Sequence, residues 1–112
     1  MFINIDLSSP PAAPQLRDPD NFTEFKVVVA NADDLRDAVW SAAARVGRVG
    51  DAEHVFVDVG ILARLAGARA DDQTWRAGLA AMVKFAEGQG WVDGAGAVRA
   101  HVELEPADGE KR

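Results

Sequence analysis

The sequence predicts a small single domain of the α/β (α+β) class, built from short strands and amphipathic helices. Its 112 residues are 48% apolar, which fits one domain of ordinary size. In some segments the apolar residues recur at helical spacing, and in others they run together or alternate as in strands. These patterns lie within residues 22–104, so we expect the globular domain there.

Residues 1–21 are predicted to form a proline-rich N-terminal arm. Four of the five prolines lie between residues 8 and 21, and proline fixes φ and removes a hydrogen-bond donor. An apolar stretch precedes them, with Phe2, Ile3, Ile5 and Leu7. This stretch is either a frayed tail, a docked strand or a contact with a second subunit. At the other end, residues 105–112 are charged and predict a flexible tail.

The first half of the domain predicts a buried strand followed by a helix. Residues 25–30 are β-branched and nearly all apolar, which is typical of a buried strand. Asn31 is a candidate helix cap, and apolar residues recur on one stripe over residues 32–46. Gly47 and Gly50 are expected to end this helix.

The second half predicts a strand, two helices and a hairpin. Residues 54–59 alternate between apolar and polar, which indicates a strand. A short helix follows over 61–66, and a longer one over 71–87 has Asp71 or Asp72 as its cap. Its apolar stripe consists of Trp75, Leu79, Met82, Val83 and Ala86. Residues 91–104 then predict a hairpin with a tight turn at 93–96.

This order of helix, strand, helix, helix and hairpin over residues 32–104 resembles the winged helix-turn-helix superfamily. Three segments carry the resemblance, namely ILARLAG at 61–67, TWRAGL at 74–79 and GWVD at 90–93. The resemblance implies a winged-helix-like domain, here with an extra N-terminal strand. It also implies DNA binding through the second helix in the major groove.

The charge distribution weakens the DNA-binding implication. The chain has 12 basic and 18 acidic residues, for a net charge of −6, whereas DNA-binding proteins usually present a basic face. Asp71 and Asp72 lie at the helix end that would enter the groove. The side chains available for nucleic acid under this hypothesis are Arg76, Lys84 and Arg99. A winged fold used for protein contact is at least as well supported.

A small α/β sandwich with a mixed sheet is the alternative fold. Strands at 25–30, 54–59, 91–92 and 97–104 would form the sheet, with helices on one face. The apolar strand 25–30 would then be central, and the winged-helix interpretation does not need that strand.

Two histidines provide the basis for a metal or polar site. His54 and His101 lie on predicted strands, opposite the valine stripes, and could converge with Asp58 and Glu103 if the strands are neighbours. The alternative is two unrelated surface histidines. Asp58 is also a candidate acid–base residue, although a helix cap for residues 60–66 explains the same position.

Trp40 lies off the apolar stripe of its helix, with Arg36 one turn earlier, so the pair is predicted to mark a partner or dimer surface.

The sequence therefore favours a small non-enzymatic interaction or accessory module that contacts another protein or a second copy of itself. A DNA-binding regulator and a small α/β enzyme or ligand-binding protein are the alternatives. No cofactor is expected. The chain has no cysteine, no signal-peptide pattern and no membrane-length apolar run, which predicts a cytoplasmic protein without a membrane partner.

Overall fold

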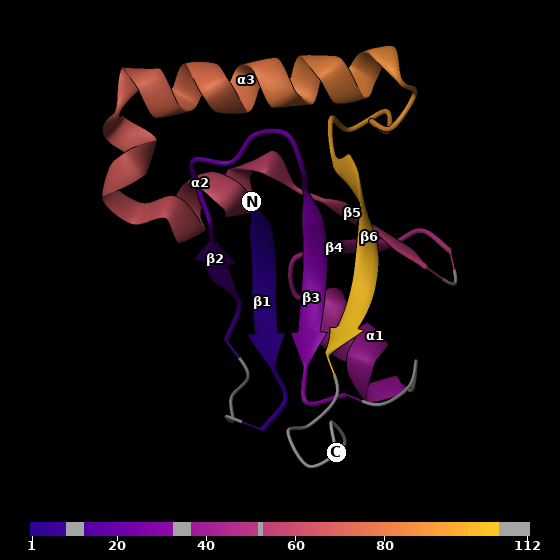
Figure 1. Cartoon of the computed structure of the whole chain (residues 1–112). Coiled ribbons are helices and arrows are strands. Elements are labelled where there is room, and N and C mark those ends of the chain that lie inside the picture. Colours follow the sequence, from indigo (N-terminus) through magenta and orange to yellow (C-terminus); the bar gives the residue numbers. More distant parts are fainter. Residues whose placement is uncertain (9–12, 33–36, 52, 106–112) are drawn as a thin grey trace.

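A mixed sheet of six strands organises the molecule, in the order β2-β1-β3-β6-β5-β4 (Figure 1). The computed structural model describes residues 1–8, 13–32, 37–51 and 53–105. The strands are β1 (Phe2–Asp6), β2 (Gln15–Arg17), β3 (Lys26–Ala30), β4 (Gly47–Val49), β5 (His54–Val57) and β6 (Val98–Glu105). The helices are α1 (Asp37–Ala43), α2 (Val59–Ala66) and α3 (Gln73–Gly88), with a 3-10 helix at Gly67–Asp71. The α+β class is confirmed.

The strand predicted at 25–30 is central, as the mixed-sheet alternative requires. It forms β3, which pairs in parallel with both β1 and β6, and the other strand pairs are antiparallel. The predicted hairpin is reduced to a single bridge between Val92 and Val98, because β6 pairs mainly with β3 and β5. The strand order is therefore set by pairings between segments far apart in the sequence.

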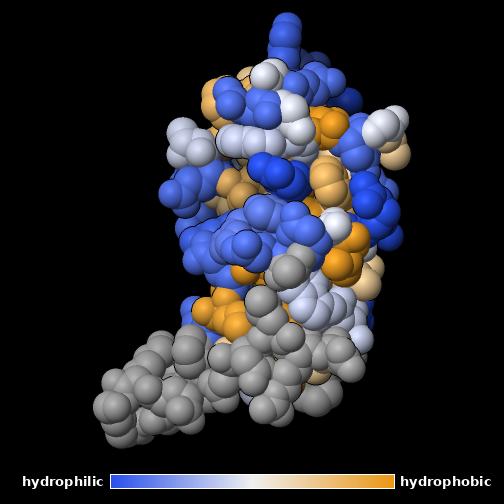
Figure 2. Space-filling model, turned by 90° about the vertical axis from the view of Figure 1, so that its right-hand side faces the viewer, coloured by the Kyte–Doolittle hydropathy of each residue, from blue (hydrophilic) through white to orange (hydrophobic). Residues whose placement is uncertain are grey.

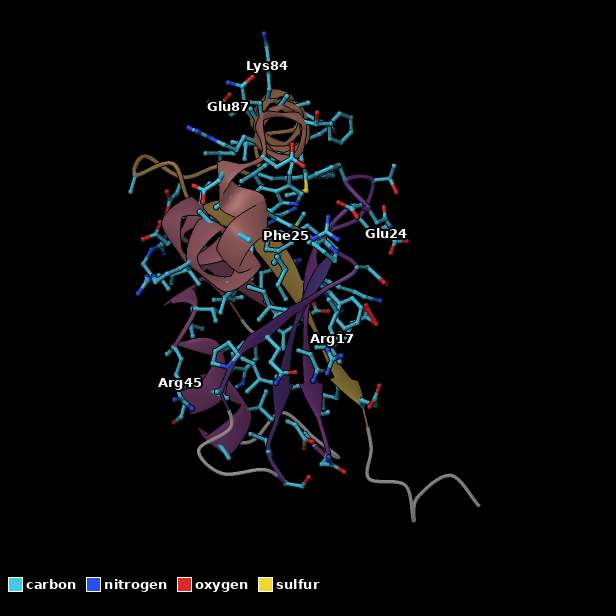
Figure 3. All side chains as sticks on the ribbon, turned by 90° about the vertical axis from the view of Figure 1, so that its left-hand side faces the viewer. Arg17, Glu24, Phe25, Arg45, Lys84 and Glu87 are labelled. Carbon is cyan, nitrogen blue, oxygen red and sulfur yellow. The ribbon has the colours of Figure 1, made fainter. Side chains whose placement is uncertain are left out.

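Among the described residues, helices cover one face of the sheet, and no helix covers the other face. Apolar side chains at alternate positions point to the covered face, where Ile3, Val27 and Val102 lie in one buried row. Figure 3 shows α1 and α2 on this side of the sheet and α3 across its end. A neighbouring row lies on the opposite face, which we call the open face, and consists of Phe2, Lys26, His101 and His54.

The expected N-terminal arm is wrong for residues 1–7 and 15–17, which belong to the domain, and of the alternatives for the apolar stretch the docked strand is the one found. Residues 2–6 form β1 between β2 and β3, and Ile3 and Ile5 are completely buried. The amino group of Met1 donates to the carbonyl oxygens of Asn21 and Glu24, at 2.8 and 3.2 Å. The alternation of apolar residues in this stretch is therefore a better guide to its structure than the prolines that follow it. Residues 9–12 lie outside the described part of the chain.

The helix expected over 32–46 is shorter than predicted, and a strand follows it. In the described residues α1 ends at Ala43, and Gly47–Val49 form β4 beside β5. A Cβ at Gly47 would lie 2.7 Å from the carbonyl carbon of Phe56, so glycine is needed for the two strands to approach. Gly47 is thus a site of close strand contact as well as a residue beyond the helix end.

The other helices agree closely with the prediction. The helix α3 begins after Asp72, whose side chain accepts from the backbone N–H of Thr74. Its buried residues are Trp75, Leu79, Met82 and Ala86, four of the five in the predicted stripe.

No helix in the described ranges is both long and apolar enough to cross a membrane. The tail expected over 105–112 is wrong for Glu105, which is the last residue of β6, and residues 106–112 lie outside the described residues.

Candidate functional site

The structure brings the two predicted histidines together on the open face. His54 of β5 and His101 of β6 are direct cross-strand partners, and their ring centroids are 5.5 Å apart. Oδ1 of Asp51 accepts a hydrogen bond from Nδ1 of His54, and the two atoms are 2.9 Å apart. Hydrogen bonds from the backbone N–H of Glu53 and from His54 hold the pKa of Asp51 below its ordinary value. The carboxylate is therefore ionised and can act only as an acceptor.

The other two members of the predicted polar cluster lie elsewhere. Asp58 is the N-cap of α2, where its side chain accepts from the backbone N–H of Gly60 at 2.8 Å. Glu103 is paired with Lys26 at 3.0 Å, and this hydrogen bond raises the pKa of Lys26. The described residues contain no group of three or more His, Cys, Asp or Glu side chains arranged to hold a metal ion. The convergence of all four residues is therefore not found.

A cleft of about 230 Å³ lies beside the two histidines, between the C-terminal half of α3 and the upper end of the open face. We call it the aromatic cleft. It is lined by Phe22, Thr23, Glu24, Phe25, His54, Met82, Phe85, Ala86, Trp91, Val98, Arg99 and His101. Its lining comes from the loop before β3, the end of α3, the turn after α3 that holds Trp91, and the strands β5 and β6.

Two exposed rings stand at the edge of the aromatic cleft. Phe85 is 61% exposed and Trp91 is 36% exposed, and their ring centroids are 6.1 Å apart in an edge-to-face arrangement. The guanidinium carbon of Arg99 lies 5.8 Å from the Trp91 ring centroid. Trp91 packs on Phe85 at the surface. Figure 2 shows a side of the molecule where hydrophilic residues dominate and hydrophobic ones form separate patches.

Sequence reasoning missed Phe85. The residue lies off the buried stripe of α3, so the helical pattern assigns it to the solvent face. A large aromatic residue on that face was the available signal, because such a side chain has little reason to be exposed on a helix that already has a core stripe.

The three candidate nucleic-acid residues do not form one surface. Arg76 and Lys84 line a groove between α2 and α3, together with Glu87 and apolar side chains. Lys84 and Glu87 point away from the sheet (Figure 3). Arg99 instead lines the aromatic cleft. The structure thus separates Arg99 from the two cations of α3.

Of the predicted interface pair, Trp40 and Arg36, the structure describes only Trp40. Trp40 is partly buried and packs against the core, although it lies off the predicted stripe. Arg36 lies outside the described residues. A partner or dimer surface at Trp40 stays a prediction.

Comparisons with known proteins find no family model, no curated protein and no solved structure that matches this chain. The resemblance to winged-helix domains therefore stays a prediction as well.

Proposed function

We propose that the protein is a non-enzymatic interaction module that binds a large apolar side chain of a partner protein in the aromatic cleft. One observation carries the proposal. The exposed large hydrophobic residues among the described ones are Val49, Phe85 and Trp91, and two of these three stand together at the edge of one cleft. Contiguous exposed aromatic surface next to a hollow is a common mark of a protein-binding site.

The energetics favour burial of these rings by a partner. Moving a large apolar side chain out of water stabilises a complex by about 1.5–3 kcal/mol, and aromatic residues dominate the binding energy of many interfaces. The cleft volume of about 230 Å³ lies below the ~300–1,000 Å³ of drug-sized ligand sites. It suits one inserted side chain better than a whole cofactor.

The local charge specifies the neighbour of that side chain. The chain as a whole is acidic, yet the cleft is lined by one cation, Arg99, and by one carboxylate, Glu24. A partner segment with Asp or Glu next to its apolar residue would place a negative charge near Arg99. We therefore expect an apolar–acidic motif in the partner.

Selection from a phage-displayed random peptide library tests the proposal. We expect the wild-type protein to enrich peptides with a large apolar residue beside Asp or Glu. Phe85→Ala and Trp91→Ala should each weaken binding of a selected peptide by about tenfold or more, because each removes a ring that the peptide buries. Arg99→Gln should weaken it less and make it less sensitive to salt.

Val49→Ala is the matched control, because Val49 is 39% exposed but lies on β4, outside the aromatic cleft. This variant should bind the selected peptides as the wild type does. The proposal is wrong if no motif is enriched, or if Val49→Ala impairs binding as strongly as the two ring substitutions. Circular dichroism of each variant shows whether the fold is kept.

A further inference from the structure

The histidine pair occupies the position in an antiparallel ladder where side chains approach most closely. The backbone N–H of Val102 donates to the carbonyl oxygen of Glu53 at 2.8 Å, so residues 53 and 102 form a hydrogen-bonded pair. His54 and His101 are the next pair along and are therefore a non-hydrogen-bonded pair. In such pairs the Cα atoms are only about 4.5 Å apart, and side chains on the same face are in contact.

The separation of the two rings matches that of two imidazoles on one metal ion. A metal–nitrogen bond of about 2.0–2.1 Å and the size of the ring place each centroid roughly 3.2 Å from the metal. At a tetrahedral angle the two centroids would then be roughly 5.2 Å apart. The observed distance is 5.5 Å, with the ring planes inclined by 69°.

The neighbouring side chains favour His54 as a metal ligand. Oδ1 of Asp51 lies 2.9 Å from Nδ1 of His54, and with the proton of this hydrogen bond on Nδ1, Nε2 keeps its lone pair for a metal. A carboxylate behind a ligating histidine fixes the ring and makes it a stronger ligand. The nearest cation in the row, Lys26, is directed to Glu103 by its ion pair. Arg99 lies against Trp91.

We propose that His54 and His101 together bind one divalent transition-metal ion of the kind that prefers imidazole, with water in the remaining coordination positions. Cu²⁺, Ni²⁺ and Zn²⁺ belong to this class, whereas Mg²⁺ and Ca²⁺ prefer oxygen ligands. The site lies at the wall of the aromatic cleft but does not rest on the proposed function, since no partner side chain takes part in it.

Calorimetric titration of the untagged, chelator-treated chain with NiCl₂, CuCl₂, ZnCl₂ and MgCl₂ tests the proposal. We expect one ion per chain for the first three metals, with Cu²⁺ the tightest, and no binding of Mg²⁺. At a hundredfold excess over Kd, the bound ion should raise the Tm by roughly 10 °C.

Variants locate the site. His54→Gln and His101→Gln should each remove the binding, and Asp51→Asn should weaken it by about 10- to 100-fold without removing it. Glu53→Gln is the control for a neighbouring acid that does not contact either ring, and it should bind normally. Paramagnetic broadening by Cu²⁺ in the wild-type amide spectrum should centre on residues 54 and 101. Absence of one-to-one binding, its survival in both histidine variants, or broadening centred elsewhere would overturn the proposal.

Discussion

Gly78 of α3 lies so close to the ring of Phe22 that a Cβ at position 78 would overlap it. This contact lets α3 pack closely against the loop before β3, and residues of the same loop line the aromatic cleft. Phe22 also packs on Trp75, with ring centroids 6.4 Å apart. A side chain at position 78 would therefore require the Phe22 ring to move from this position.

Gly78→Ala should destabilise the protein even though alanine is the better helix former. The overlap with Phe22 is expected to cost about 1–3 kcal/mol, which exceeds the ~1 kcal/mol gained in helix propensity. Gly88→Ala is the matched control, because Gly88 belongs to the same helix and has no atom within 4 Å of its added Cβ. Urea unfolding should show a loss of stability for the first variant and none for the second. Equal effects would contradict the packing argument.

Asp58 is expected to act as a helix cap. Asp58→Ala should lower the free energy of unfolding by about 0.5–2 kcal/mol, because the backbone N–H of Gly60 loses its acceptor. Asp58→Asn keeps an acceptor oxygen and should change stability little. Thermal unfolding of the two variants checks this. Were both to lose the same stability, the charge of Asp58 would matter more than its capping bond.

Acidification should weaken the turn after α3. Asp93 accepts from the Arg48 side chain and from the backbone N–H groups of Ala95 and Ala97, and these bonds, with Arg48 the largest cause, hold its pKa below the ordinary value. A lowered folded-state pKa contributes stability above the unfolded-state value of about 3.9, and this is lost as pH falls through the folded-state pKa. The stability difference between wild type and Asp93→Asn should therefore shrink below about pH 4.

Arg48→Met provides the second arm of this experiment. It removes the largest cause of the shift and leaves the two backbone donors in place. NMR titration of the Asp93 carboxyl carbon should show a higher pKa in this variant than in the wild type. An unchanged titration would mean that the ion pair at 2.9 Å does not persist in solution.

Trp75 should stabilise the fold through its ring nitrogen as well as through its area. Its side chain is 3% exposed, and Nε1 donates to the carbonyl oxygen of Pro19 at 2.8 Å. Trp75→Phe keeps an aromatic ring but deprives Pro19 of its donor, so we expect a loss of about 1 kcal/mol or more. Faster hydrogen exchange in residues 19–25 should accompany it. An unaltered exchange rate there would show that the bond does not hold this loop.

The sequence predicts the helices of this protein well and its sheet only in part. The helix α3 has four buried residues at helical spacing and a capping aspartate, and both signals are local. The position of β1 depends on β3, and that of β4 on a glycine that meets Phe56 across the sheet. Such dependence on distant partners leaves little trace in a short window of sequence.

The candidate site, like the sheet, was predictable from the sequence only in part. The alternation of residues 54–57 and 98–104 is enough to put both histidines on one face, and the pairing of β5 with β6 then makes them neighbours. Asp58 and Glu103 were predicted in the cluster because they share a strand face with the histidines, whereas Asp58 caps a helix and Glu103 pairs with Lys26. The aromatic cleft joins side chains from several separate segments, so no single segment could reveal it.

The central position of β6 has a consequence for how the chain folds during synthesis. The strands β1, β2 and β3 come from the first thirty residues and β4 and β5 from residues 47–57, and β6 is the strand that joins these two groups. Until residues 98–105 have left the ribosome, β3 and β5 each present an unpaired inner edge, rich in valine. Completion of the sheet is therefore a late, non-local step, and a nascent chain stalled before it would be prone to self-association.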